Sequence, residues 1–152
     1  MKRTMRCGIM AAMLLAASAH AQGPVADAAI LPPDALAHAD GEQVFRHICQ
    51  GCHMPDARGA TGAGTYPALA GDPKLASATF AAEIVLGGRR DMPSFGPRPD
   101  LQGFDAMRHV DLTDAQIAAV VNYVRSHFGN HYADTIGAAD VAALHPQTPR
   151  KP

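Results

Sequence analysis

The stretch Cys49-Gln50-Gly51-Cys52-His53 decides how this chain is interpreted. Two cysteines stand three positions apart, and a histidine follows the second one directly. A lone cysteine pair in an exported chain first suggests a disulfide, while this spacing also occurs in thioredoxin-like redox pairs, in halves of zinc sites and in c-type haem attachment. In the last case each thiol adds to a vinyl group of the haem, and the next imidazole faces the iron. The rest of the chain discriminates between these interpretations.

The N-terminus predicts export. The first six residues carry three basic side chains, and Ile9 to Ala19 is an apolar run of 11 residues. Ala19-His20-Ala21 then supplies the small residues that a signal peptidase recognises, so residues 1–21 are predicted to be a signal peptide cut before Gln22. The alternative is an uncleaved membrane anchor, which the shortness of the apolar run disfavours. Export predicts a periplasmic location.

Export and cysteine usage favour haem attachment. Cys7 is lost with the signal, so no second cysteine pair remains to complete a zinc site, and no βαβ pattern suggests a thioredoxin fold. The sequence therefore predicts one covalent haem c. Removing the signal deletes three of the 13 basic residues and none of the 14 acidic ones, which leaves a net charge of −4. With no basic stripe we expect no nucleic-acid binding, and with no second long apolar stretch we expect no integral membrane span.

Helix signals divide the mature chain into a leader (22–38), a domain (39–130) and a C-terminal tail (131–152). Two segments have capping boxes, in which a polar side chain caps the helix and a glutamine follows three residues later. One box, Asp40 with Gln43, starts a helix that runs into the cysteine motif, and the other, Thr113 with Gln116, starts the most regular helix of the chain. The apolar positions of that second helix recur at 3.6-residue spacing and end before Gly129-Asn130: Ile117, Val120, Val121, Val124 and Phe128.

The remaining segments give weaker signals. Ser77 to Leu86 is predicted to be a short helix that Gly87-Gly88 ends, and Asp140 to Leu144 to be a single turn. We predict loops over Met54 to Tyr66 and Pro97 to Asp111, no strand anywhere, and disorder at the C-terminal His145 to Pro152.

The residues from Asp40 to Asn130 resemble the class I bacterial cytochromes c. The resemblance implies an all-α fold of three or four helices around one haem. It also implies that the first and last helices cross closely where Gly41 lets them approach, with Phe45 packed near Tyr123. The matching positions are Gly41, Phe45, Cys49, Cys52 and His53, then Pro67, Leu69 and Gly71, and later Met92-Pro93.

The same resemblance assigns the haem-binding residues. Cys49 and Cys52 hold the haem, and His53 and Met92 are the axial iron ligands. The carbonyl of Pro67 accepts a hydrogen bond from the Nδ1 of His53. Competing sixth ligands are Met107 and His109, because their segment could fold back toward the iron; Arg89 and Arg90 are either partners of a haem propionate or a solvated pair.

The resemblance implies an electron carrier rather than an enzyme. The segment NYVRSHFGN followed by IGAADVAAL resembles the ends of cytochromes that serve periplasmic dehydrogenases. The expected donor is therefore such a dehydrogenase, and the expected acceptor is a terminal oxidase or another cytochrome. One alternative is a peroxidase or sensor with an open iron; another is a subunit fixed to its dehydrogenase. The stretch Pro97 to Val110 is longer than in the family, and is either a docking element or a passive loop.

Overall fold

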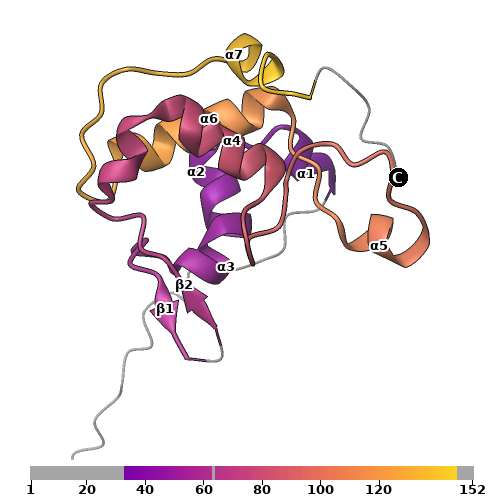
Figure 1. The fold of residues 1–152 in the computed structure, drawn as a ribbon, viewed down its shortest axis with the longest axis horizontal. Helices are drawn as coiled ribbons and strands as arrows, with labels where there is room; N and C mark the ends of the chain where they lie inside the picture. The colour runs from indigo at the N-terminus through magenta and orange to yellow at the C-terminus, as the bar shows by residue number, and fades with distance from the viewer. Residues whose placement is uncertain (1–32, 63, 147–152) are drawn as a thin grey trace, which may run out of the picture.

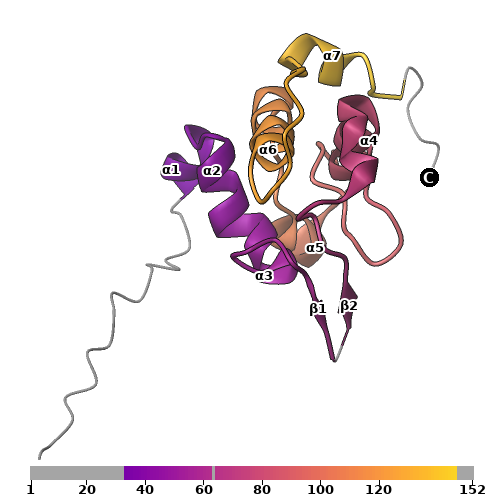
Figure 2. The same ribbon diagram turned by 90° about the vertical axis from the view of Figure 1, so that its left-hand side faces the viewer.

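A computed structural model describes residues 33–62 and 64–146. The predicted signal peptide, most of the leader and residues 147–152 lie outside the described residues. The described chain is mainly helical, and helix α6 (Asp114–Ser126) lies at its centre (Figure 1). Figure 2 shows α6 between α2 (Gly41–Val44) on one side and α4 (Ala78–Gly87) on the other, with α7 (Ala138–Ala142) across the end. No helix of the described part is long and apolar enough to cross a membrane.

The first helical rod delivers the cysteine motif. It consists of α2, a wide π-helical turn η1 (Phe45–Cys49) and α3 (Gln50–His53). The predicted capping box is confirmed, because the Asp40 side chain accepts from the Gln43 amide and the Gln43 side chain accepts from the Asp40 amide. In η1 the amide of Gln50 donates to the carbonyl of Phe45, five residues back. Wide turns of this kind are rare overall but frequent at functional sites. This one ends at the first cysteine of the motif, Cys49.

Helix α6 supplies most of the buried apolar surface. Its predicted capping box, Thr113 with Gln116, is confirmed, and its predicted periodic positions from Ile117 to Val124 are buried. The helix ends at Ser126, earlier than predicted, because Phe128 and Gly129 adopt left-handed backbone conformations that reverse the chain. Phe128 therefore reaches the core from this turn and not from the helix.

The two main helices cross at Gly41, as predicted. A Cβ atom at this position would lie 2.3 Å from the carbonyl oxygen of Ala119 on α6. The Phe45 ring packs beside Tyr123, with 5.8 Å between the ring centroids, and beside Phe128, with 4.7 Å. Only a residue without a side chain allows this separation, and the three aromatic rings pack on one another nearby.

Gly41→Ala is expected to destabilise the protein by about 2–3 kcal/mol, because the added methyl group meets backbone atoms that cannot rotate away. Gly51→Ala is the matched control, since a Cβ at Gly51 meets nothing within 4 Å. The free energy of unfolding of the two holoproteins in urea measures the difference. Equal stability of the two variants would contradict the close crossing.

Two predicted loops contain regular structure, and the prediction of no strand is wrong. The predicted loop after His53 contains a short antiparallel hairpin, β1 (Ala60–Thr61) and β2 (Thr65–Tyr66), with Ala60 opposite Tyr66. The predicted irregular stretch after Pro97 contains α5 (Gly103–Arg108). Strands of two residues are too short to show an alternation of apolar and polar side chains. Helix α5 has no side-chain cap, so its sequence carries no helix-start signal.

The chain also has structure on both sides of the predicted domain. Helix α1 (Pro33–Ala37) lies in the segment predicted as a flexible leader, and the Gln116 side chain donates to the carbonyl of Leu36. The segment after α6, predicted as a tail, includes α7 and buries Ile136 and Val141 against the core. The short helix η2 (Pro73–Ala76) precedes α4, which the Ser77 side chain caps. Helix α4 matches the predicted Ser77 to Leu86 to within one residue.

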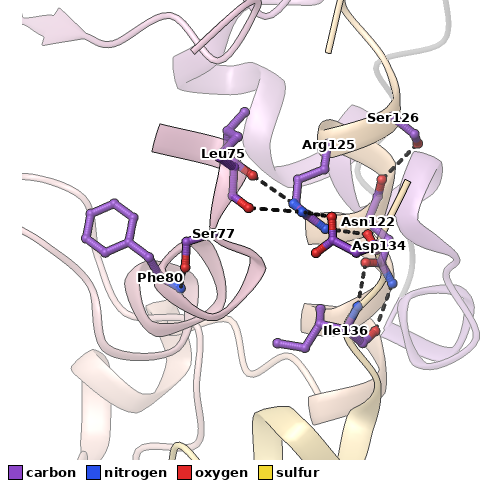
Figure 3. A network of polar contacts seen from close by, with 9 residues as sticks. Leu75, Ser77, Phe80, Asn122, Arg125, Ser126, Asp134 and Ile136 are labelled. Atoms are coloured by element: carbon purple, nitrogen blue, oxygen red, sulfur yellow. Dashed lines mark hydrogen bonds and ion pairs between the residues drawn. The ribbon is translucent and has the colours of Figure 1, made fainter. Parts of the chain in front are cut away.

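A buried arginine fastens the segment after α6 to the core. Arg125 has no exposed surface, although it stands in the last turn of α6, where arginines usually face water. Figure 3 shows its guanidinium between Leu75 and Asp134. Nε donates to the carbonyl of Leu75 at 2.8 Å, and Nη2 donates to the Asp134 carboxylate at 2.7 Å. The Tyr132 ring lies 5.3 Å from the guanidinium carbon.

Candidate haem-binding site

Cys49 and Cys52 are free thiols on adjoining turns of the first helical rod. Cys49 is half-buried and Cys52 is exposed. Burial, and then the neighbouring Cys52, raise the pKa of Cys49 to about 12. A thiol with this pKa is protonated at neutral pH. Among the described residues no group of three or more His, Cys, Asp or Glu side chains is placed to hold a metal ion.

His53 closes the motif and is held in one orientation. Its side chain is buried, with the residue 7% exposed, and its Nδ1 lies 2.9 Å from the carbonyl oxygen of Pro67. A carbonyl only accepts hydrogen bonds, so Nδ1 carries the proton and Nε2 keeps its lone pair. Nε2 has no hydrogen-bond partner within residues 33–62 and 64–146. An imidazole held in this way is the form that binds a metal ion. The residues present therefore fit a haem iron, with His53 ready to bind it through Nε2.

The backbone around Pro67 is tightly packed. The amide of Gly59 donates to the His53 carbonyl at 3.0 Å, and Gly59 adopts φ +68°. A Cβ at Gly59 would lie 2.1 Å from the Tyr66 carbonyl oxygen and 2.8 Å from that of Pro67. Gly59 thus lets the loop after His53 pass directly against the Pro67 carbonyl, which accepts the hydrogen bond from His53.

Met92 lies in a tight turn after α4. Its backbone exchanges two hydrogen bonds of 3.0 Å with Arg89, and its side chain is half-buried. Gly88, at φ +73°, makes this turn possible, because a Cβ there would lie within 3 Å of the Met92 carbonyl oxygen and the Ser94 amide. Arg89 lies over the Phe80 ring, with 5.5 Å between the guanidinium carbon and the ring centroid. Gly88 and the hydrogen bonds with Arg89 therefore hold the backbone around Met92, the predicted sixth ligand.

The competing sixth ligands are placed differently. Met107, on α5, is 83% exposed. His109 directs its Nε2 to the carbonyl of Gly96 and to the carboxylate of Asp111, each at 3.0 Å. The amide of Leu112 also donates to the carbonyl of Phe95. These contacts join the two ends of the stretch Pro97 to Val110 close to the Met92 loop. Helix α5 lies between those joined ends.

Sequence patterns do not identify two residues that shape this region, Gly59 and Asn130. Gly59 stands in a run of small residues that gives no sign of packing against Pro67. By sequence, Asn130 is only a residue that ends a helix. In the structure it is buried, and its side-chain amide donates to the carbonyls of Leu69 and Val124. Its contact with Leu69 joins residues 61 positions apart, which no local pattern can indicate.

Comparisons with known proteins agree with this site. The family model described as Cytochrome c matches residues 38–128. The fructose dehydrogenase cytochrome subunit of Gluconobacter japonicus is 36% identical over 104 residues, which is 62% of this chain and 20% of that protein. The cytochrome c subunit of the quinone-type alcohol dehydrogenase of Gluconobacter oxydans is 30% identical over 107 residues, 68% of this chain and 21% of that protein.

A third relative is the gluconate 2-dehydrogenase cytochrome c subunit of Pantoea cypripedii, which is 33% identical over 113 residues. That match covers 68% of this chain and 23% of the relative. The chain thus spans about a fifth of the length of these curated relatives. The motif Cys49-Gln50-Gly51-Cys52-His53, the orientation of His53 and the family match lead to one conclusion: the chain belongs to the cytochrome c family and has one covalently bound haem c.

Proposed function

We propose that this chain is a periplasmic single-electron carrier in which His53 and Met92 are the axial ligands of the haem iron. The observation that supports it best is the buried His53 ring, whose Nδ1 faces the Pro67 carbonyl while Nε2 keeps a free lone pair. An enzyme that binds a substrate at the iron needs an open coordination position. A carrier needs a closed one, and Met92 in its constrained turn is the residue to close it.

Each residue has a distinct role in this proposal. The haem supplies a one-electron iron couple when bound. Cys49 and Cys52 keep it attached through every redox cycle, and His53 is held as the Nε2 ligand by its proton on Nδ1. The Met92 thioether is a neutral, soft donor, so it favours the reduced iron and raises the potential relative to a second nitrogen ligand.

The relatives support a dehydrogenase as the electron donor. Three of them are cytochrome subunits of dehydrogenases for fructose, alcohol and gluconate. We propose that the present chain likewise accepts electrons from a periplasmic dehydrogenase, as a free carrier or as a bound subunit. A terminal oxidase or another cytochrome would then be the acceptor, and the chain itself would catalyse no substrate chemistry.

Met92→Ala is expected to give a folded holoprotein that has lost its sixth ligand. The weak sulfur-to-iron absorption of the oxidised protein should disappear, the reduced protein should bind carbon monoxide, and the midpoint potential should fall. Absorption spectra and potentiometric titration of the purified holoprotein measure all three properties. Met107→Ala is the matched control, because Met107 is a methionine of the same chain that is largely exposed on α5.

Two results would contradict the proposal. If the sulfur band persisted in Met92→Ala and vanished in Met107→Ala, the sixth ligand would be Met107. If the wild-type protein lacked the band and bound carbon monoxide, the iron would be open, and the peroxidase or sensor alternative would hold instead.

A further inference from the structure

The turn after α6 is strained and places one polar side chain in the core. Phe128 has φ +57°, a left-handed conformation that side chains rarely adopt, and Gly129 follows with φ +80°. The Phe128 ring packs on Phe45, which helps to hold this conformation. Strain of this kind persists only where the surroundings enforce it, and often at functional positions. Here it turns the chain back so that Asn130, 3% exposed, lies against the end of α6.

The Asn130 amide connects two separate parts of the chain. Its Nδ2 donates to the Val124 carbonyl at 2.9 Å and to the Leu69 carbonyl at 3.0 Å. Because both partners only accept, the amide group can be oriented in one way alone. One bond joins the asparagine to α6, and the other joins it to the segment that contains Pro67.

The segment that contains Pro67 sets the position of the carbonyl that accepts the hydrogen bond from His53 Nδ1. Leu69 follows Pro67 by two residues, and its amide donates to the Ala57 carbonyl at 2.7 Å. Leu69 is thus fixed on both sides, through its amide by Ala57 and through its carbonyl by Asn130. A shift of Leu69 would move the neighbouring Pro67 carbonyl away from the Nδ1 of His53.

We infer that Asn130 is a positioning residue for His53: by holding the Leu69 carbonyl, its amide keeps the Pro67 carbonyl on the histidine Nδ1. The inference rests on the proposed function in that His53 is taken as the iron ligand. A firm hydrogen bond from Nδ1 makes the imidazole a stronger donor, which stabilises the oxidised iron. Loosening the bond should therefore raise the midpoint potential.

The experiment compares Asn130→Ala with the wild-type holoprotein labelled with ¹⁵N-histidine. In the reduced state, NMR gives the solvent-exchange rate of the His53 Nδ1 proton, and potentiometry gives the potential. We expect this proton to exchange roughly tenfold faster in the variant and the potential to rise, since the contact loses a good part of its strength. Asn130→Ser keeps one donor and should give an intermediate exchange rate; it also replaces the alanine variant if that variant yields no holoprotein.

Asn122→Ala is the matched control. Asn122 lies on α6, and its side-chain amide donates to the carbonyl of Ile136 and accepts from the Ile136 backbone amide (Figure 3). Its loss should lower stability and leave the His53 proton unaffected. Unchanged proton exchange in Asn130→Ala, or equally faster exchange in Asn122→Ala, would overturn the inference. Wild-type His53 ring resonances without the large ring-current shift of a haem ligand would instead contradict the proposed ligation, independently of the Asn130 comparison.

Discussion

Cys49→Ala and Cys52→Ala should each prevent the protein from accumulating with normally attached haem. Each substitution removes one of the two thioether bonds, and under the proposed ligation the remaining bond would hold the haem less firmly against His53. We expect the core to depend on the haem, because apolar side chains close in sequence to the predicted haem-binding residues are only partly buried, among them Ile48, Leu69 and Phe95. Loss of haem should therefore also lower the amount of folded protein.

Denaturing gel electrophoresis with haem staining, normalised to total protein, measures the attachment. Gln50→Ala is the matched control, since Gln50 lies between the two cysteines and contributes no thiol. We expect at least about a tenfold loss of stain in each cysteine variant, since removing a bond that holds the folded state lowers its population steeply. Wild-type staining in both variants would contradict attachment through these cysteines. Intact mass spectrometry of any stained band then shows whether one thioether survives.

The features that could be predicted from the sequence are local ones. Both capping boxes join residues three positions apart, and the sequence places their partners side by side. The spacing of the cysteine motif is equally local. The crossing at Gly41 is a long-range contact, and it was predicted only through the family resemblance, because nothing in the neighbouring residues indicates that Ala119 lies opposite.

The features that were missed depend on distant partners. Asn130 and Gly59 are ordinary turn residues by sequence, and their importance comes from the carbonyls of Leu69 and Pro67. The Met92 turn lies between these cases. Gly87-Gly88 predicted that a helix ends there, but the close approach of Gly88 to Met92 and Ser94 emerges only from the folded chain.

The sequence position of Arg125 suggests an exposed side chain, whereas the structure buries it completely. An arginine in the last turn of an amphipathic helix normally lies in water near the helix C-terminus. Here the residues after α6 return over it, so its donors reach carbonyls on both sides: those of Leu75 and Ala76 before α4, and that of Asp134 beyond α6. The arginine thus substitutes for the regular backbone pairing that these irregular segments lack.

Arg125→Leu is expected to destabilise the holoprotein by about 2–4 kcal/mol, because it leaves buried carbonyls without donors. The cost should stay below that of breaking a fully buried ion pair, since the Asp134 side chain is 69% exposed and remains hydrated. Urea unfolding of the holoprotein at neutral pH measures the change. Arg46→Leu is the matched control, as Arg46 forms an exposed pair with Glu42 and its replacement should change the stability little.

The same ion pair predicts how stability depends on pH. The hydrogen bond from Arg125 lowers the pKa of Asp134 below its ordinary value. A carboxyl whose pKa is lower in the folded state contributes stability above its unfolded pKa of about 3.9, and that contribution is lost as pH falls through the folded pKa. Asp134→Asn keeps the shape and an acceptor but removes the charge, so the wild type should exceed it in stability at pH 6 and lose that advantage below about pH 4. In the Arg125→Leu background the Asp134→Asn substitution should have no such pH-dependent effect. If it had the same effect in both backgrounds, the carboxylate would be acting on stability independently of Arg125, and the buried guanidinium would be held by its carbonyl partners alone.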